Sequence, residues 1–156
     1  MGVYIEADTS MKRHISATVR SCFGALRQIR SIRRALSRQA LTTLVRALVV
    51  SRVDYCNSVL AGISGHLLDR LQSVLNAAAR LIYSANRSYS ITPLLRELRW
   101  LKVPERIEFR LCVLVYRCLE GSAPSYFAEG IHRTTDNSTC KRLRSADTMT
   151  LLVPSS

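Results

Sequence analysis

Residues 51–62, with the sequence SRVDYCNSVLAG, concentrate side chains that enzymes use. The segment brings together a carboxylate, a phenol, a thiol, an amide and hydroxyls, which are the groups of acid–base and nucleophilic catalysis. However, Asp54 follows Val53 on a predicted helix and has no second acid beside it, so a two-metal site would need a distant partner. We therefore interpret the segment as a polar helix end, with Tyr55 packed and Cys56 buried, rather than as a catalytic loop.

Other candidate sites are equally weak. Residues 62–66, GISGH, lack the final glycine of the G-x-S-x-G motif and follow no predicted strand, which argues against a nucleophile elbow. The three histidines are far apart and are not paired with cysteines at zinc-binding spacing. Glu105 and Glu108 alternate with Arg106 and Arg110, which is typical of a solvated, salt-bridged helix face. The sequence predicts no catalytic residue, no metal site and no cofactor, and so no enzyme.

The charge distribution is the strongest signal in the sequence. The chain of 156 residues carries 23 Lys and Arg against 11 Asp and Glu, a formal net charge of +12. Residues 9–53 hold 10 of these basic residues and no acid. Such a block is typical of proteins that bind a polyanion.

Four arginines recur at intervals of seven residues within this block, namely Arg13, Arg20, Arg27 and Arg34. A heptad step on an α-helix drifts by only about 20° and advances by about 10 Å, so the four should follow one face. Arg13 lies about 200° from Ile15 around such a helix, which places the row opposite the apolar stripe. Because the guanidinium group can donate two bonds to one phosphate, nucleic acid is the favoured partner, ahead of a merely solvated face or an acidic protein or lipid. The candidate nucleic-acid-binding residues are Lys12, Arg13, Arg20, Arg27, Arg30, Arg34 and Arg38.

Apolar periodicity predicts a mainly all-α protein of about four to six helices in a compact bundle. The first helix should start after Ser10, and its face is lost at Arg33. Ser37 should cap a second helix that reaches Leu60, and Ser64 a third. The second helix should bury Leu41, Leu44, Val45, Leu48, Val49 and Val53. Shorter elements should follow from Thr92–Pro93 to about Arg99, from Val103 to a stop at Gly121, and over residues 124–128.

The predicted organisation is a short strand at residues 1–8, a helical domain at 9–130 and a poorly ordered, flexible tail at 131–156. A single strand is not stable alone, so it needs helices or a sheet beside it. The chain contains five cysteines but no Cys-x-x-Cys pair, which favours reduced, mostly buried thiols in an intracellular protein, nuclear or cytoplasmic. Neither a signal peptide nor a transmembrane segment is expected.

Several segments together resemble one family. These are GVYI at residues 2–5 followed by Ser10 and His14, then residues 51–62, LQSVLNAAARLI at 71–82, ITPLLRELRWL at 91–101, PERIEFR at 104–110 and GSAPSY at 121–126. In this order they resemble the region that follows the polymerase palm in reverse transcriptases of LINE-type (non-LTR) retrotransposons. The resemblance spans nearly the whole chain.

The resemblance implies a thumb-like helical module, with the strand left over from a missing palm. It also implies that the segment around Asp54 is a helical landmark beyond the catalytic core. The polymerase aspartates of the family lie in an upstream Tyr-x-Asp-Asp box, which does not occur here, and the endonuclease domain is also absent. Because the family pattern usually continues beyond residues 151–154, we expect a fragment cut at both ends.

The expected partner is RNA or DNA, bound through its backbone without sequence preference, and no membrane. A thumb grips the primer–template duplex in this way, which the resemblance carries over to the basic first helix. Two alternatives stay open at this stage. One is a protein-interaction module that self-associates through exposed apolar helix faces, and the other is a product of a decayed element with no selected role.

Overall fold

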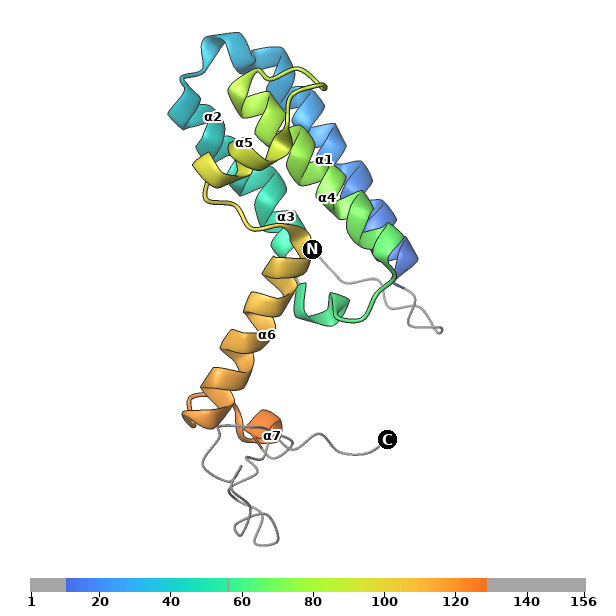
Figure 1. The fold of residues 1–156 in the computed structure, drawn as a ribbon, viewed down its shortest axis with the longest axis vertical. Helices are drawn as coiled ribbons and strands as arrows, with labels where there is room; N and C mark the ends of the chain where they lie inside the picture. The colour runs from blue at the N-terminus through green and yellow to red at the C-terminus, as the bar shows by residue number, and fades with distance from the viewer. Residues whose placement is uncertain (1–10, 56, 129–156) are drawn as a thin grey trace, which may run out of the picture. The chain divides into compact units, whose positions relative to one another are not determined.

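The structure is a computed structural model that describes residues 11–55 and 57–128 (Figure 1). All regular elements among these residues are helical, which confirms the all-α prediction. The predicted strand at residues 1–8 and the predicted tail at 131–156 lie outside the described residues. The elements are α1 (Lys12–Ile32), η1 (Arg33–Ala35), α2 (Arg38–Val45), η2 (Arg46–Val50), α3 (Ser51–Asp54), η3 (Asn57–Leu60), α4 (Gly65–Tyr83), α5 (Ile91–Glu97), α6 (Val103–Leu119) and α7 (Ser125–Ala128).

The chain divides into two compact units, residues 1–109 and residues 110–156. In the first unit, α1 and α4 run side by side, the segment from α2 to α3 packs against this pair, and α5 packs against α4 (Figure 1). In the second unit, the described residues comprise the end of α6 and α7.

The apolar core of the first unit forms between α1, α4 and the helical segment from α2 to α3. Ile15, Ile29, Leu71 and Val74 are almost completely buried. Ala78 and Ala79 of α4 are also fully buried, as expected for small residues that let a neighbouring helix approach closely. Burial of such side chains contributes about 25 cal/mol per Å² of apolar surface removed from water, so this stripe fixes which side of α1 faces inward.

The helix that follows Ser37 differs from its prediction. A π-helical turn, η2, interrupts it, and the N–H of Ser51 donates to the carbonyl of Arg46, five residues back. The extra residue in such a turn rotates the downstream side chains. Val50 is therefore buried, whereas Leu44 is half-buried and Leu48 is exposed, so their predicted burial was wrong.

This helix also ends earlier than predicted. Tyr55 takes an extended backbone conformation (φ −66°, ψ 120°), so α3 stops at Asp54 and a separate 3-10 turn, η3, contains Leu60. Tyr55 is 40% exposed, and its predicted packing was therefore wrong. The central expectation for the segment is confirmed, because Asp54 is the last residue of a helix and not part of a loop.

The predicted helix boundaries are confirmed in most places. The Ser37 hydroxyl accepts from the Ala40 N–H, as an N-cap does. Gly121 takes a positive φ of 68° after α6, where the N–H groups of Gly121 and Ser122 donate to the carbonyls of Cys118 and Arg117. This Schellman arrangement explains the stop. One boundary differs: α5 begins at Ile91 after Ser90, and so starts before the predicted Thr92–Pro93 cap.

Candidate nucleic-acid interface

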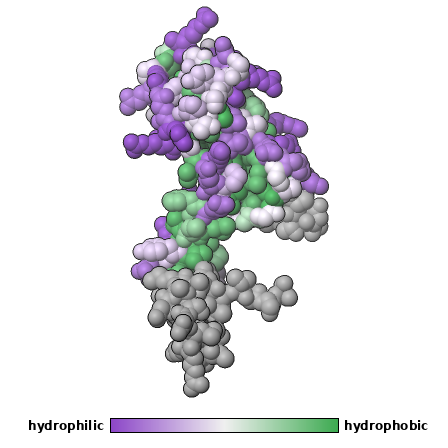
Figure 2. All heavy atoms as spheres, in the orientation of Figure 1, coloured by the Kyte–Doolittle hydropathy of each residue, from purple (hydrophilic) through white to green (hydrophobic). Residues whose placement is uncertain are grey.

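The first helix presents one apolar side to the core and one basic side to solvent. Ile15, Cys22, Leu26 and Ile29 are buried, at spacings that repeat every turn or every second turn. The candidate residues on α1 are all exposed, and Arg13, Arg20 and Arg27 lie opposite the apolar side. Figure 2 shows hydrophilic side chains projecting over much of the drawn face of the first unit. The predicted relation between the apolar stripe and the basic row is therefore present in α1.

The row itself is shorter than the heptad pattern predicted. Arg13, Arg20 and Arg27 share the exposed side of α1, but α1 ends at Ile32 and Arg34 lies in η1. Arg34 is exposed, yet the α-helical period no longer fixes its direction. Lys12 and Arg30 lie beside the row, in the first and last turns of α1, and both are exposed. We call the exposed side of α1 that carries Lys12, Arg13, Arg20, Arg27 and Arg30 the basic face.

Acidic side chains of the described residues do not neutralise Arg20, Arg27 or Arg30. The two ion pairs that join described residues lie elsewhere, between Arg38 and Glu97 and between Arg106 and Asp54. A solvated surface normally mixes both signs of charge, whereas α1 contains no acid. Arg20, Arg27 and Arg30 therefore form a field of positive charge that no acidic side chain of the described residues compensates.

Arg38 is the exception among the candidate residues. It belongs to α2, hydrogen-bonds to Glu97 and lies over the Tyr83 ring, with its guanidinium carbon 4.1 Å from the ring centroid. The hydrogen bond to Glu97, with a smaller contribution from Tyr83, raises the pKa of Arg38 above its usual value. Because Glu97 and Tyr83 already engage the guanidinium group, we do not count Arg38 in the basic face.

Two arginines that the sequence analysis did not select reach α1 from other helices. Arg52 of α3 donates from Nη1 to the Ser21 hydroxyl at 2.7 Å and to the Ser21 carbonyl at 3.4 Å. Arg70 of α4 donates from Nη1 to the Ser16 hydroxyl at 3.1 Å. Ser21 is 31 residues from Arg52 in sequence, and Ser16 is 54 residues from Arg70, so no local sequence pattern could have indicated these contacts. The acid-free block, which contains Arg52, was the available signal for one of them.

The start of α1 is poorly suited to a helix N-terminus. Met11 at the N-cap has a left-handed conformation (φ 52°) and makes no side-chain capping bond, and the first turn contains no acid. Lys12 and Arg13 instead place positive charge at the positive end of the helix dipole, which is electrostatically unfavourable. Natural proteins violate local preferences of this kind at functional or strained sites.

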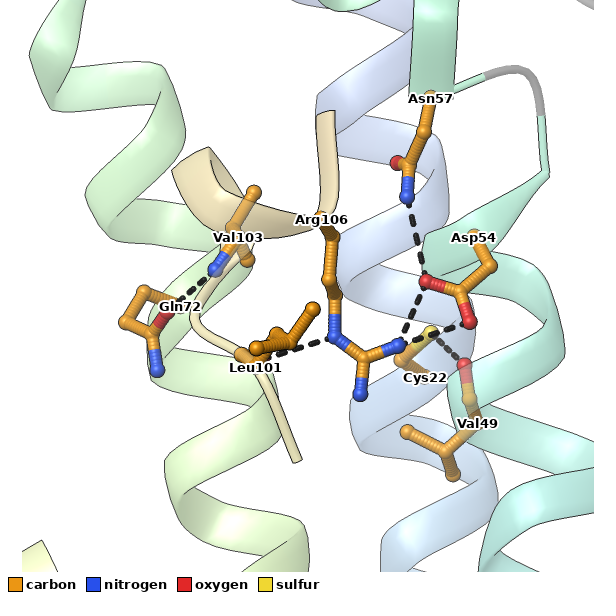
Figure 3. A network of polar contacts seen from close by, with 8 residues as sticks. All are labelled: Cys22, Val49, Asp54, Asn57, Gln72, Leu101, Val103 and Arg106. Atoms are coloured by element: carbon orange, nitrogen blue, oxygen red, sulfur yellow. Dashed lines mark hydrogen bonds and ion pairs between the residues drawn. The ribbon is translucent and has the colours of Figure 1, made fainter. Parts of the chain in front are cut away.

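The segment that resembled a catalytic loop holds the structure together (Figure 3). Arg106 of α6 donates from Nη1 to both oxygens of Asp54 at 2.8 Å, and from Nε to the Leu101 carbonyl at 2.8 Å. The Asn57 amide donates to Asp54 at 3.1 Å. The Arg106 and Asp54 side chains are only 13% and 27% exposed. Asp54 therefore ties α3 to the start of α6, and Arg106 is not the solvated residue that its neighbouring acids predicted.

Gln72 completes the support for the start of α6. Its carbonyl oxygen accepts from the Val103 N–H at 2.9 Å (Figure 3). Its amide group donates to Asn76 at 2.8 Å. The Glu105 carboxylate accepts from the N–H of Lys102 at 2.8 Å, as in one half of a capping box. These bonds satisfy amides that a helix start leaves without an internal partner.

Two buried titratable groups of α1 face the core. Cys22 is fully buried, and its thiol donates to the Val49 carbonyl in η2 with an S···O distance of 3.8 Å. Burial raises the pKa of this thiol to about 11, and the charge of Arg52 offsets part of the rise. His14 is 6% exposed, and desolvation lowers its pKa. Both groups are neutral at pH 7, so neither supplies a nucleophilic thiolate or a cation.

The thiols were only partly predicted. Cys22 and Cys118 are buried as expected, whereas Cys112 on α6 is exposed. Cys56 and Cys140 lie outside the described residues.

No group of three or more His, Cys, Asp or Glu side chains within residues 11–55 and 57–128 is arranged to hold a metal ion. Over the same residues, no helix has the length and apolarity needed to cross a membrane. An open hollow beside α2 is lined by apolar and uncharged polar side chains, namely Leu36, Ser37, Gln39, Ala40, Thr43, Leu44 and Ala47. That lining has no charge with which to bind an anion.

Comparison with known proteins gives no match. A scan against protein-family models, a search of curated proteins and a search of solved structures each find none.

Proposed function

We propose that this chain is a non-catalytic, thumb-like helical fragment of a LINE-type reverse transcriptase and that it binds nucleic acid through the basic face of α1. The resemblance of the ordered motifs supports the parent family. The observation that carries the binding function is the acid-free, exposed basic face on a helix whose other side is anchored in a packed core.

The chemistry of this face favours contacts to phosphate. Successive arginines of the row stand about 10 Å apart along a rigid helix, and their guanidinium groups are good partners for phosphate oxygens. Contacts of this type position a protein on nucleic acid but do not distinguish bases. The binding should therefore be independent of sequence and dominated by counterion release.

Fluorescence anisotropy at several salt concentrations tests the proposal with labelled RNA and DNA. With four to six phosphate contacts, the logarithm of the association constant should fall with the logarithm of salt concentration at a slope of about −3 to −5. A variant that combines Arg13→Glu, Arg20→Glu, Arg27→Glu and Arg34→Glu should not bind at physiological salt. Unchanged affinity in this variant would rule the site out. A primer-extension assay should give no product.

A second candidate function rests on exposed aromatic side chains in the second unit. Tyr116 is 63% exposed and Tyr126 69% exposed, while Phe127 is 42% exposed and its ring centre lies 4.7 Å from that of Tyr126. Exposed aromatic clusters are typical of surfaces that bind another protein. Self-association would be favoured if sedimentation velocity showed a defined dimer and the Tyr116→Ser variant were monomeric. The dimer should then have no affinity for nucleic acid.

A further inference from the structure

We infer that Arg52 and Arg70 belong to the same nucleic-acid site and bind phosphates at the two borders of the arginine row formed by Arg13, Arg20 and Arg27. This inference rests on the proposed function and adds binding residues from α3 and α4 to those of α1. It turns a row on one helix into a surface built by three.

The first observation is the place where each arginine meets α1. Ser16 and Ser21, the acceptors of the two hydrogen bonds, are about 140° apart around an α-helix, and Arg20 lies between them. By the same geometry, Arg20 is about 40° from Ser16 and about 100° from Ser21. Arg70 therefore approaches the row from one side and Arg52 from the other.

The second observation is the donor capacity that both arginines retain. A guanidinium group has five N–H donors, and each of these contacts uses Nη1. The Nη2 and Nε groups of Arg52 and Arg70 have no partner among the described residues, and neither side chain takes part in an ion pair with them. A phosphate at either border could accept from these remaining donors without displacing the serine.

The third observation is that the serine contacts fix the guanidinium groups in advance. A long side chain that is already held loses less conformational entropy when it binds than one that moves freely in solvent. Arg52 is half-buried and its charge acts on the neighbouring Cys22 thiol, which is consistent with a defined position beside α1. The two border arginines should therefore contribute at least as much per residue as those of the row.

The test compares three charge-matched double variants of the full chain, measured by anisotropy with a labelled duplex DNA over a range of salt. These are Arg52→Ala with Arg70→Ala, Arg20→Ala with Arg27→Ala, and Arg96→Ala with Arg99→Ala as the control. Arg96 and Arg99 are exposed and lie in and just after α5, which packs against α4. Thermal unfolding of each variant checks that it is folded at the temperature of the assay.

We expect the border pair and the row pair each to reduce the salt slope by about 2, and to weaken binding by about 60-fold at 0.1 M salt. The control pair should change the slope by less than either. If the row pair loses affinity and the border pair behaves like the control, this inference is wrong and the proposed function stands. If all three pairs match the wild type, both are wrong.

A second set of variants separates charge from position. Ser16→Ala with Ser21→Ala keeps every positive charge but removes the hydroxyls that hold the guanidinium groups. We expect an unchanged salt slope with an affinity several-fold weaker than that of the wild type. Equal affinity would show that the serine contacts do not prepare the arginines for binding.

Discussion

At the scale of single residues, the chemistry suggested by residues 51–62 is structural. Asp54 supplies both of its oxygens to Arg106, and Asn57 supports it from the other side. The sequence alone placed Asp54 correctly at a helix end, because the apolar period runs up to Val53. It could not indicate Arg106 as the partner, since that residue lies 52 positions away and its neighbouring acids suggested a different pairing.

Loss of this pair should destabilise the protein. Asp54→Ala leaves the largely buried Arg106 guanidinium without its carboxylate, which we expect to lower the free energy of unfolding by about 2–3 kcal/mol. Urea unfolding measures the change. Asp54→Ala combined with Arg106→Met is the control and should recover much of the loss, because neither charge is then left alone. Unchanged stability in Asp54→Ala would contradict the structural role.

His14 should make stability dependent on pH. Burial lowers its pKa in the folded state below the ordinary value of 6.5, so the unfolded chain takes up the proton first as the pH falls. The free energy of unfolding should therefore decrease from pH 6.5 downwards, and His14→Phe should lack this part of the decrease. Urea unfolding between pH 7.5 and pH 5 gives the comparison. Parallel curves for the two proteins would show that His14 does not contribute.

At the scale of elements, the apolar periodicity predicted which side of a helix is buried and where most helices end. It did not predict local departures from the α-helix. The apolar stripe of α1 and its end before Arg33 follow directly from the sequence, as do the start of α2 at the Ser37 cap and the stop of α6 at Gly121. The π turn η2 was not predictable, because its side chains fit an ordinary helix equally well. It forms within the packed structure, where the Val49 carbonyl accepts from Cys22, and it changes which leucines are buried.

The start of α1 should show a conflict between stability and binding. Lys12→Glu removes a positive charge from the positive end of the helix dipole, so we expect a gain of about 0.3–1 kcal/mol in the free energy of unfolding together with weaker binding of nucleic acid. Urea unfolding and fluorescence anisotropy measure the two effects.

Arg30→Glu is the matched control at the other end of α1. It makes the same change of charge on the basic face, but at the negative end of the dipole, so it should weaken binding and also lower the free energy of unfolding by about 0.3–1 kcal/mol. If both variants changed stability in the same direction, the dipole would not be the cause.

At the scale of the whole molecule, a helical scaffold displays positive charge on one of its outer helices. The composition of residues 9–53 was sufficient to predict the basic face, since ten basic residues without an acid cannot all be buried or paired within the segment. The same composition was not sufficient to predict which arginines lie beside α1 in the folded protein. Folding brings Arg52 and Arg70 to α1 and directs Arg38 to Glu97, and both results depend on contacts between distant helices.

The most direct test of the central claim is one comparison of charge-reversal variants in a nucleic-acid binding titration at 0.1 M salt. Arg20→Glu with Arg27→Glu alters the basic face, and Arg96→Glu with Arg99→Glu makes the same change of net charge around α5. If α1 is the binding surface, the first variant should bind at least 100-fold more weakly than the wild type, while the second loses less than about tenfold. Equal losses in the two variants would mean that net charge alone attracts the polyanion, and would contradict a site on α1.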